Sequence, residues 1–233
     1  MDASAYAFVR GIRVTRTTLS AWNRRPGPVL GGWLLGSLAA ATALLIAVWL
    51  IAALSQGHSG ITLGHPPLVV GDWGDVGRIL YRNSLVLALH AMACVAGFIA
   101  GSALPLQADR HRGLMRAIHR HGGRLAILFV IAATTFSLSA QAYVLGNSVA
   151  NVAFALGTSP GLLLLSLLPH AVMELVALFL PLAAWIIASR RGEWDQLLAA
   201  TLVTVTIAVP VLFISALWEV FVAPHIVQSL LGY

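Results

Sequence analysis

Charged residues are scarce in this chain of 233 residues: they make up 9% of the sequence, whereas hydrophobic residues make up 59%. An average soluble domain has about 25% charged residues, so the composition excludes an ordinary soluble domain. A bilayer core about 30 Å thick needs roughly 20 apolar residues for each helix. The chain therefore has room for about five membrane spans and none for a separate catalytic domain.

Lysine is absent and cysteine occurs once. All 14 basic residues are arginines, against eight acids, and the formal net charge is +6. We attribute the missing lysines to codon usage and derive no function from them. The single Cys94 lies inside an apolar run, which excludes an intramolecular disulfide and a thiolate metal site. We expect it to pack as a small hydrophobic residue.

The basic excess does not indicate a nucleic-acid-binding protein. The arginines gather in short segments beside apolar runs, a distribution that insertion topology and anionic lipid head groups explain. The lipid bilayer is the expected surrounding of the chain, and no nucleic-acid partner is expected.

The motifs of common hydrolases and nucleotide-binding enzymes are also missing. The sequence has no His-Glu-x-x-His, no glycine-rich phosphate loop and no Gly-x-Ser-x-Gly turn. His170 and Glu174 offer two ligands on one helix face and His90 a third, but a catalytic zinc also needs a separate general base. We predict no enzyme activity, no cofactor and no metal site.

Long apolar runs predict an all-α, polytopic integral membrane protein with five transmembrane helices in a single domain, residues 30–233. The predicted spans are 30–54, 84–104, 125–145, 161–188 and 196–222. Residues 1–29 are polar and carry five arginines, which predicts a basic cytoplasmic leader. The first apolar run is too long for a cleaved signal peptide.

Two segments between spans are predicted to lie on the outer side. Glycines, prolines and two aspartates make residues 55–83 the longest external loop, and Asp75 is placed to cap a helix over residues 76–82. Residues 146–160 are uncharged, and their apolar content favours a short interfacial or re-entrant segment.

Residues 109–124 form a predicted internal loop that is strongly basic. Arginines that recur every four residues favour a helix lying on anionic lipid, with Leu114 and Ile118 turned toward the membrane. A solvated loop without such a helix is the alternative.

Prolines mark the ends and the interior of the predicted spans. Pro105 is predicted to end the second span and Pro224 the fifth, because proline has no backbone N–H to donate. Pro169 and Pro181 lie inside the fourth span, so we expect proline to kink that helix.

The distribution of arginines predicts the orientation. With the N-terminus inside, 12 of the 14 arginines face the cytoplasm, as the positive-inside rule requires. The inverted arrangement reverses this bias. We therefore predict a multi-pass protein of the bacterial cell membrane with its N-terminus inside and its C-terminus outside.

A few polar residues fall in the predicted spans, where a charge at the helix centre costs roughly 2.5–3.5 kcal/mol. In the predicted orientation all of them lie in the outer half of the bilayer. We predict an externally open polar cavity between spans two, four and five, in which Glu219 pairs with a flanking arginine and Glu174 is shared with His170. The alternative is that these residues only hold helices together. The cluster comprises Asn83, His90, His170, Glu174 and Glu219, with Arg78 and Arg82 as candidate ion-pair partners.

Three short motifs carry a family resemblance. Residues 167–177, Leu-Leu-Pro-His-Ala-Val-Met-Glu-Leu-Val-Ala, resemble the Pro-His-Gly-x-x-Glu-Leu signature of the stage II sporulation protein M family. The pair Arg82-Asn83 resembles the asparagine before a glycine-rich helix in that family, here with Gly97 and Gly101. The ending from Glu219 to Pro224 resembles its terminal Glu-x-x-x-x-Pro.

The resemblance covers roughly residues 80–225, with two departures: Ala171 replaces the usual glycine and Val176 a common proline. It implies a membrane scaffold like the one in the peptidoglycan-degrading machinery of spore engulfment. Other relatives accompany the maturation and export of circular bacteriocins. Such analogy is associational.

We therefore expect a non-enzymatic scaffold or subunit of an envelope assembly, with other membrane or cell-wall remodelling proteins as partners. Self-association into a homo-oligomer is left open. The alternative is a proton-coupled transporter or export permease component that uses Glu174 and His170.

Overall fold

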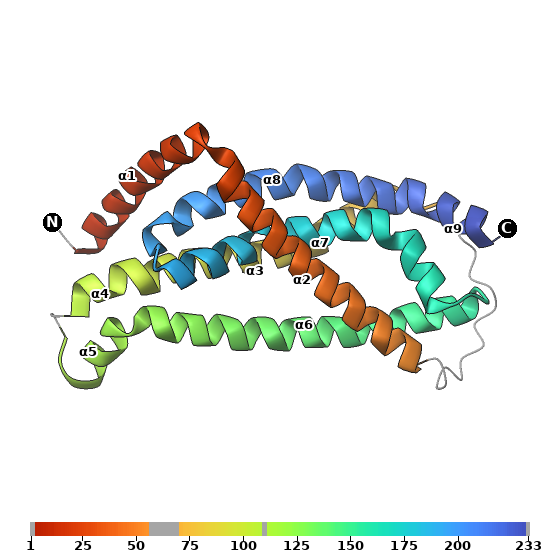
Figure 1. Cartoon of the computed structure of the whole chain (residues 1–233), viewed down its shortest axis with the longest axis horizontal. Coiled ribbons are helices and arrows are strands. Elements are labelled where there is room, and N and C mark those ends of the chain that lie inside the picture. Colours follow the sequence, from red (N-terminus) through yellow and green to blue (C-terminus); the bar gives the residue numbers. More distant parts are fainter. Residues whose placement is uncertain (1–2, 56–69, 109–110, 232–233) are drawn as a thin grey trace.

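The described part of the chain, residues 3–55, 70–108 and 111–231 of a computed structural model, is helical and contains no strand. Five of its helices are long and apolar enough to cross a membrane. Figure 1 shows them as a bundle with the two termini at opposite ends. They are α2 (Pro26–Ser55), α3 (Trp73–Phe98) with its continuation to Ser102, α6 (Gly122–Ala155), α7 (Pro160–Arg191) and the helical stretch Trp194–Ser229 that contains α8 (Leu197–Leu217).

Shorter elements complete the described chain. A helix precedes α2 at the N-terminal side. One π-helical turn follows α3 and another follows α8, and a short helix lies between α4 and α6 in the chain. They are α1 (Ala3–Arg24), η1 (Ile99–Ala103), α4 (Leu104–Gln107), α5 (Gly113–Arg120), the 3-10 turn η3 (Trp194–Gln196), η4 (Trp218–Val222) and α9 (Ala223–Leu231).

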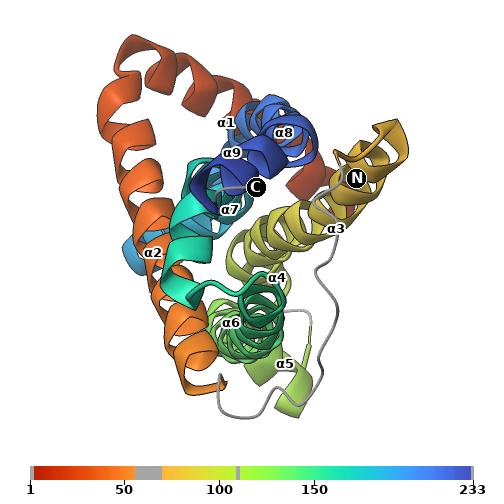
Figure 2. The ribbon, with the colours of Figure 1, turned by 90° about the vertical axis from the view of Figure 1, so that its right-hand side faces the viewer.

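Helix α7 forms the centre of the bundle. It packs against α2, α3 and α8, and the end-on view in Figure 2 shows it surrounded by other helices. Lipid tails are as apolar as the protein core, so moving a side chain from lipid into the core gains little free energy. Close van der Waals packing between the helices stabilises such contacts instead. Small residues permit that packing: a Cβ added at Gly36 of α2 would lie 3.1 Å from Cβ of Ala183 in α7.

Cys94 lies in the main apolar core between α3, α7 and α8. It is 0% exposed and free, and its thiol donates a hydrogen bond of 3.2 Å to the carbonyl of Pro181. The prediction that it packs as a small buried residue is confirmed.

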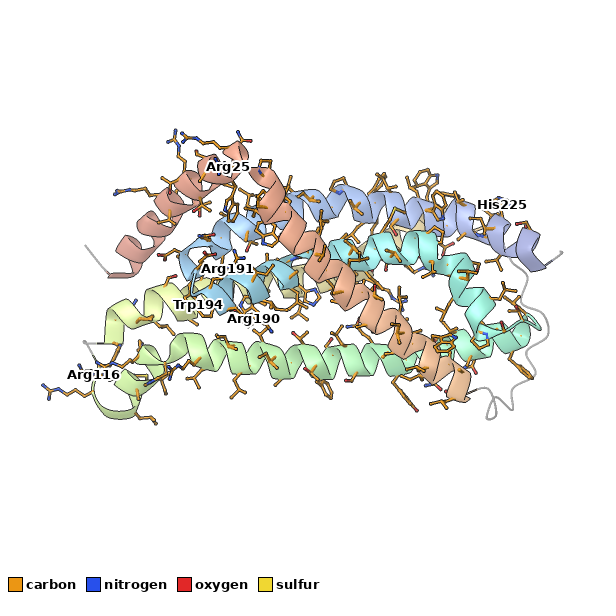
Figure 3. All side chains as sticks on the ribbon, in the orientation of Figure 1. Arg25, Arg116, Arg190, Arg191, Trp194 and His225 are labelled. Atoms are coloured by element: carbon orange, nitrogen blue, oxygen red, sulfur yellow. The ribbon has the colours of Figure 1, made fainter. Side chains whose placement is uncertain are left out.

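Arginines of the α1–α2 turn, of α5 and of the end of α7 lie in one half of the molecule, whereas Arg78 and Arg82 belong to the first turns of α3. Figure 3 shows Arg25, Arg116, Arg190 and Arg191 in the half that contains α1 and α5, whereas His225 lies at the opposite end. We call these two ends the arginine end and the far end.

The segment predicted as a polar leader is a helix. Helix α1 carries a basic residue in its last turn and packs against α8 and η3. Helix α2 begins at Pro26, before the predicted residue 30. Proline suits this position because the first helical amides have no intrahelical acceptor.

Helix α3 begins with a capping box that corrects the predicted cap. The Asp72 side chain accepts a 3.0 Å hydrogen bond from the Asp75 amide, and the Asp75 side chain accepts one of 2.9 Å from the Asp72 amide. Asp72 is therefore the N-cap and Asp75 the third helical residue, and the helix starts at Trp73 rather than at residue 76. Residues 56–69 of the predicted external loop lie outside the described residues, and residues 73–83 belong to α3 instead of a loop.

Part of the basic segment is a helix, as one alternative predicted, and the contact of this helix with lipid stays a prediction. Helix α5 covers Gly113–Arg120, and its Leu114 and Ile118 side chains are 78% and 39% exposed.

The predicted interfacial or re-entrant segment over residues 146–160 is wrong. Helix α6 continues without a break to Ala155, because Ala150 and Ala153 are buried against neighbouring helices and hold the last turns in place. A turn with Gly157 at φ 62° follows, and Ser159 caps α7.

Pro105 and Pro224 do not end their helices, contrary to prediction. A π-helical turn precedes each: Leu104 donates its amide to Ile99, and Ala223 donates to Trp218. A proline ring collides with the carbonyl four residues earlier, and the wider π turn relieves this collision. The helices therefore continue as α4 and α9. Helix α7 is likewise assigned as one helix across Pro169 and Pro181.

Candidate functional site

The predicted polar residues come from three parts of the bundle. Helix α3 contributes Asn83 and His90, α7 contributes His170 and Glu174, and η4 contributes Glu219. Asn83, His90 and His170 are 8%, 9% and 6% exposed, and the two glutamates are partly buried. These side chains are thus withdrawn from the outer surface of the bundle.

Glu174 lies at the centre of the group. The polar groups that act on its carboxylate are Asn83, Ser215 and Glu219. Helices α3, α7 and α8 with η4 therefore converge on one carboxylate, and the structure brings together three of the predicted residues, Asn83, Glu174 and Glu219. We call Asn83, His170, Glu174, Ser215 and Glu219 the polar cluster.

Ser215 is the member that the sequence analysis missed. Its side chain is 0% exposed, and its hydroxyl donates a 3.2 Å hydrogen bond to the backbone carbonyl of His170. The available signal was its spacing: Ser215 precedes Glu219 by four residues, which places both on one helix face.

Two buried nitrogen atoms in the cluster have no hydrogen-bond partner among the described residues. They are Nδ2 of Asn83 and Nδ1 of His170. Leaving a buried donor or acceptor unpaired costs roughly 1–3 kcal/mol. Asn83 lies near Glu174, and His170 lines a cavity together with Glu219, so each of the two nitrogen atoms belongs to a side chain beside a carboxylate.

A cavity of about 330 Å³ adjoins the cluster. His170 and Glu219 are its titratable lining residues, and the other walls come from α6, from α7 and from the segment around Pro224. The cavity therefore lies between the third, fourth and fifth spans beside the π turn η4, and the prediction that the second span lines it is wrong. His170 and Glu219 share it although they lie on different helices.

The predicted ion pairs are not found. The Arg78 guanidinium bonds to Asp75, one turn away on the same helix, and Arg82 is exposed. Among the described residues Glu219 has no ion pair. Asp75 is the nearer and more exposed acid, so Arg78 pairs with it without the desolvation that a pair with Glu219 would require.

The predicted sharing between His170 and Glu174 is not found either. Nδ1 of His170 has no hydrogen-bond partner in the described part of the chain, and the groups that act on Glu174 come from other helices. His170 and Glu174 are four residues apart on one helix face, but their side chains form no hydrogen bond or ion pair with each other.

His90 stands apart from the polar cluster. Its Nδ1 lies 2.8 Å from the carbonyl of Leu178, and its ring centroid lies 5.7 Å from that of Phe179. It lines a different cavity, of about 270 Å³, between α3 and α6. His90 thus joins α3 to α7 by a hydrogen bond and ring packing.

The chemistry of the cluster is that of proton or small-cation binding. Two carboxylates close enough to interact in an apolar bundle, as Glu174 and Glu219 are, repel when both are ionised, so a proton or cation bound there relieves the repulsion. Among the described residues no group of three or more histidine, cysteine, aspartate or glutamate side chains is arranged to hold a metal ion.

Comparison with known proteins adds no relative: the chain matches no protein-family model, no curated protein and no solved structure.

Proposed function

We propose that the protein is a non-enzymatic scaffold, or a subunit of an envelope assembly, that binds partner membrane proteins along α6. The exposure of α6 carries this proposal. In its most apolar stretch only 11% of the residues are buried, against 56% in α7. A long helix that is so weakly packed leaves one face free for another transmembrane helix.

The free face of α6 has the residue pattern of a helix-packing surface. Phe129, Phe136 and Tyr143 recur every seven residues and are 72%, 77% and 66% exposed. Ala132 and Ser139 lie between them and are also exposed. Large and small residues therefore alternate at heptad spacing, so that aromatic rings fit the spaces beside small residues of a facing helix. We call these five residues the α6 face.

Hydroxyl groups strengthen the case for a protein partner over lipid. The hydroxyl of Thr206 bonds back to the carbonyl of Leu202 at 2.8 Å, and other span hydroxyls do the same. Thr135 and Ser139 make no such bond to any described residue. Lipid tails offer no hydrogen-bond partner, whereas a facing helix does.

The proposed orientation places the arginine end in the cytoplasm and the far end outside. The separation of the labelled arginines from His225 in Figure 3 supports it, because positive residues remain on the cytoplasmic side. In this orientation the protein is a multi-pass component of a bacterial cell membrane. We further propose that Pro169 bends α7 near the cavity.

Membership of the stage II sporulation protein M family is part of the proposal. The residues that carry the resemblance lie in three separate segments, and three of them, Asn83, Glu174 and Glu219, meet in the polar cluster. This convergence supports the resemblance. By analogy the partners are other membrane proteins or cell-wall remodelling proteins.

A pull-down from native membranes tests the scaffold proposal. Ala132→Leu and Ser139→Leu place bulk on the α6 face, so we expect both to lose co-purifying proteins that the wild type retains. Ala39→Leu is the matched control, because Ala39 is exposed near the middle of α2. Equal retention by the α6 variants and the control contradicts the proposal.

A second candidate function is proton-coupled transport or a role as an export permease component. The charge interaction between Glu174 and Glu219, and the cavity that Glu219 and His170 line, favour it. Glu174→Gln separates the two functions in a liposome flux assay paired with the pull-down. Flux by the wild type that Glu174→Gln abolishes, with partners retained, supports transport. No flux in either form, with partners that only the α6 variants lose, supports the scaffold.

A further inference from the structure

A cavity at the arginine end is formed where α1 meets α2. The chain turns at Arg25, whose amide donates a 3.1 Å hydrogen bond to the carbonyl of Trp22, and Figure 1 shows the two helices meeting at an angle. The cavity measures about 460 Å³, within the range of roughly 300–1,000 Å³ of small-molecule sites.

The walls of this cavity are mainly apolar and aromatic. Trp22 of α1 and Trp33 of α2 meet edge to face, with ring centroids 5.1 Å apart, and Val203 of α8 closes another side. Ser20 and Asn23, both exposed, are its polar lining residues. Tryptophan is enriched where a membrane protein crosses the lipid head-group region.

Positive charge lies next to the cavity, because Arg24 and Arg25 stand between its lining residues Asn23 and Pro26. Residues 3–55 contain five arginines and no acid. The exposed side chains of Arg13, Arg16, Arg24 and Arg25 have no ion pair with any described residue. Of the elements that pack against α1, only η3 contains an acid, Asp195. The site therefore carries a large excess of positive charge next to an apolar hollow.

We propose that this cavity binds an anionic glycerophospholipid. An acyl chain lies along Trp22, Trp33 and Val203, and the phosphate head group lies between the arginines of α1 and the α1–α2 turn. Ser20 and Asn23 offer hydrogen bonds to the glycerol and ester oxygens. The proposal uses the charge and shape of the arginine end and is independent of the α6 face.

Charge complementarity selects the anionic lipid over a zwitterionic one. A zwitterionic head group places an ammonium beside its phosphate, which the arginines repel. Each arginine near an anionic head group strengthens binding about fivefold. Because the cavity is mainly apolar, the ligand also needs an acyl chain to fill it. This requirement distinguishes the site from one that binds phosphate alone.

Native mass spectrometry of the purified full chain in mild detergent tests the proposal. Phosphatidylglycerol and phosphatidylcholine with identical acyl chains are added at equal concentration. We expect the wild type to retain phosphatidylglycerol preferentially. Glycerol phosphate, which lacks acyl chains, should fail to displace it.

Two variants locate the site. The double variant Arg24→Gln/Arg25→Gln should weaken phosphatidylglycerol binding about 30-fold, whereas Arg190→Gln/Arg191→Gln removes equal charge elsewhere at the arginine end and should leave it unchanged. Val203→Phe fills the hollow and should weaken binding with every arginine retained. Equal binding of both lipids, equal effects of the two double variants, or displacement by glycerol phosphate would overturn the proposal.

Discussion

Substitution of Gly97 by alanine tests how closely α3 packs against α7 and α8. A Cβ at this position would lie 2.6 Å from Nε1 of Trp185 and 2.9 Å from Cδ1 of Leu197. These two side chains are 2% and 0% exposed, so neither has free space into which it can move. Gly77 is the matched control, because it lies on the same helix with no atom within 4 Å of its added Cβ.

The added methyl group has two opposing effects on the free energy of unfolding. Replacing glycine by alanine inside a helix stabilises the protein by roughly 0.5–1 kcal/mol, and Gly77→Ala should show this gain alone. Overpacking a filled core costs about 1–3 kcal/mol, and Gly97→Ala adds this cost. We therefore expect Gly97→Ala to be about 1–3 kcal/mol less stable than Gly77→Ala.

Reversible denaturant titration of the two variants in mild detergent, followed by circular dichroism, measures this difference. Tryptophan fluorescence gives a second probe, because Trp185 lies at the contact. Equal free energies of unfolding for Gly97→Ala and Gly77→Ala would refute the close approach of α3 to Trp185, and with it the placement of Asn83 and His90 against α7.

Three further measurements test the topology, a helix cap and the polar cluster. In a Cys94→Ala background, a membrane-impermeant thiol reagent added to intact cells should label Ser159→Cys and not Arg116→Cys; the reverse pattern would invert the orientation. Asp72→Ala should lower the free energy of unfolding by about 0.5–2 kcal/mol through loss of the capping box, and Asp72→Asn should retain most of it. Ser215→Ala should cost about 0.5–1.5 kcal/mol through loss of its hydrogen bond to α7, measured by the same titration; no change would mean that this bond contributes nothing.

The sequence was sufficient to predict the five long helices but not their ends. Long apolar runs must satisfy every backbone group internally in lipid, which makes the helix predictable from composition. The same need to satisfy backbone groups keeps a helix continuous at prolines and polar residues that would end it in water. Pro105, Pro224 and the residues before Ala155 are therefore helical, although their sequence signals indicated breaks.

The members of the polar cluster were predictable, but their partners were not. Polar residues inside an apolar span are rare, so Glu174 and Glu219 stand out from sequence alone. Helix periodicity, however, identifies neighbours only within one helix. The contacts of Glu174 come from α3 and from the α8–η4 region, and they depend on the rotation of each helix about its axis, which packing determines.

The π turn η4 makes chain length at the far end as restrictive as residue type. A π turn holds one residue more than an α-helical turn, so closing η4 into an α-helical turn with the chain length unchanged would rotate α9 by about 100° relative to α8. Val227, which is 5% exposed and packs with Ala153, Leu156 and Leu163, would then leave its contact. Insertions and deletions between Pro224 and Val227, after the π turn, should therefore be excluded even where single substitutions are tolerated, whereas loss of one residue within η4 should be accommodated by an α-helical turn.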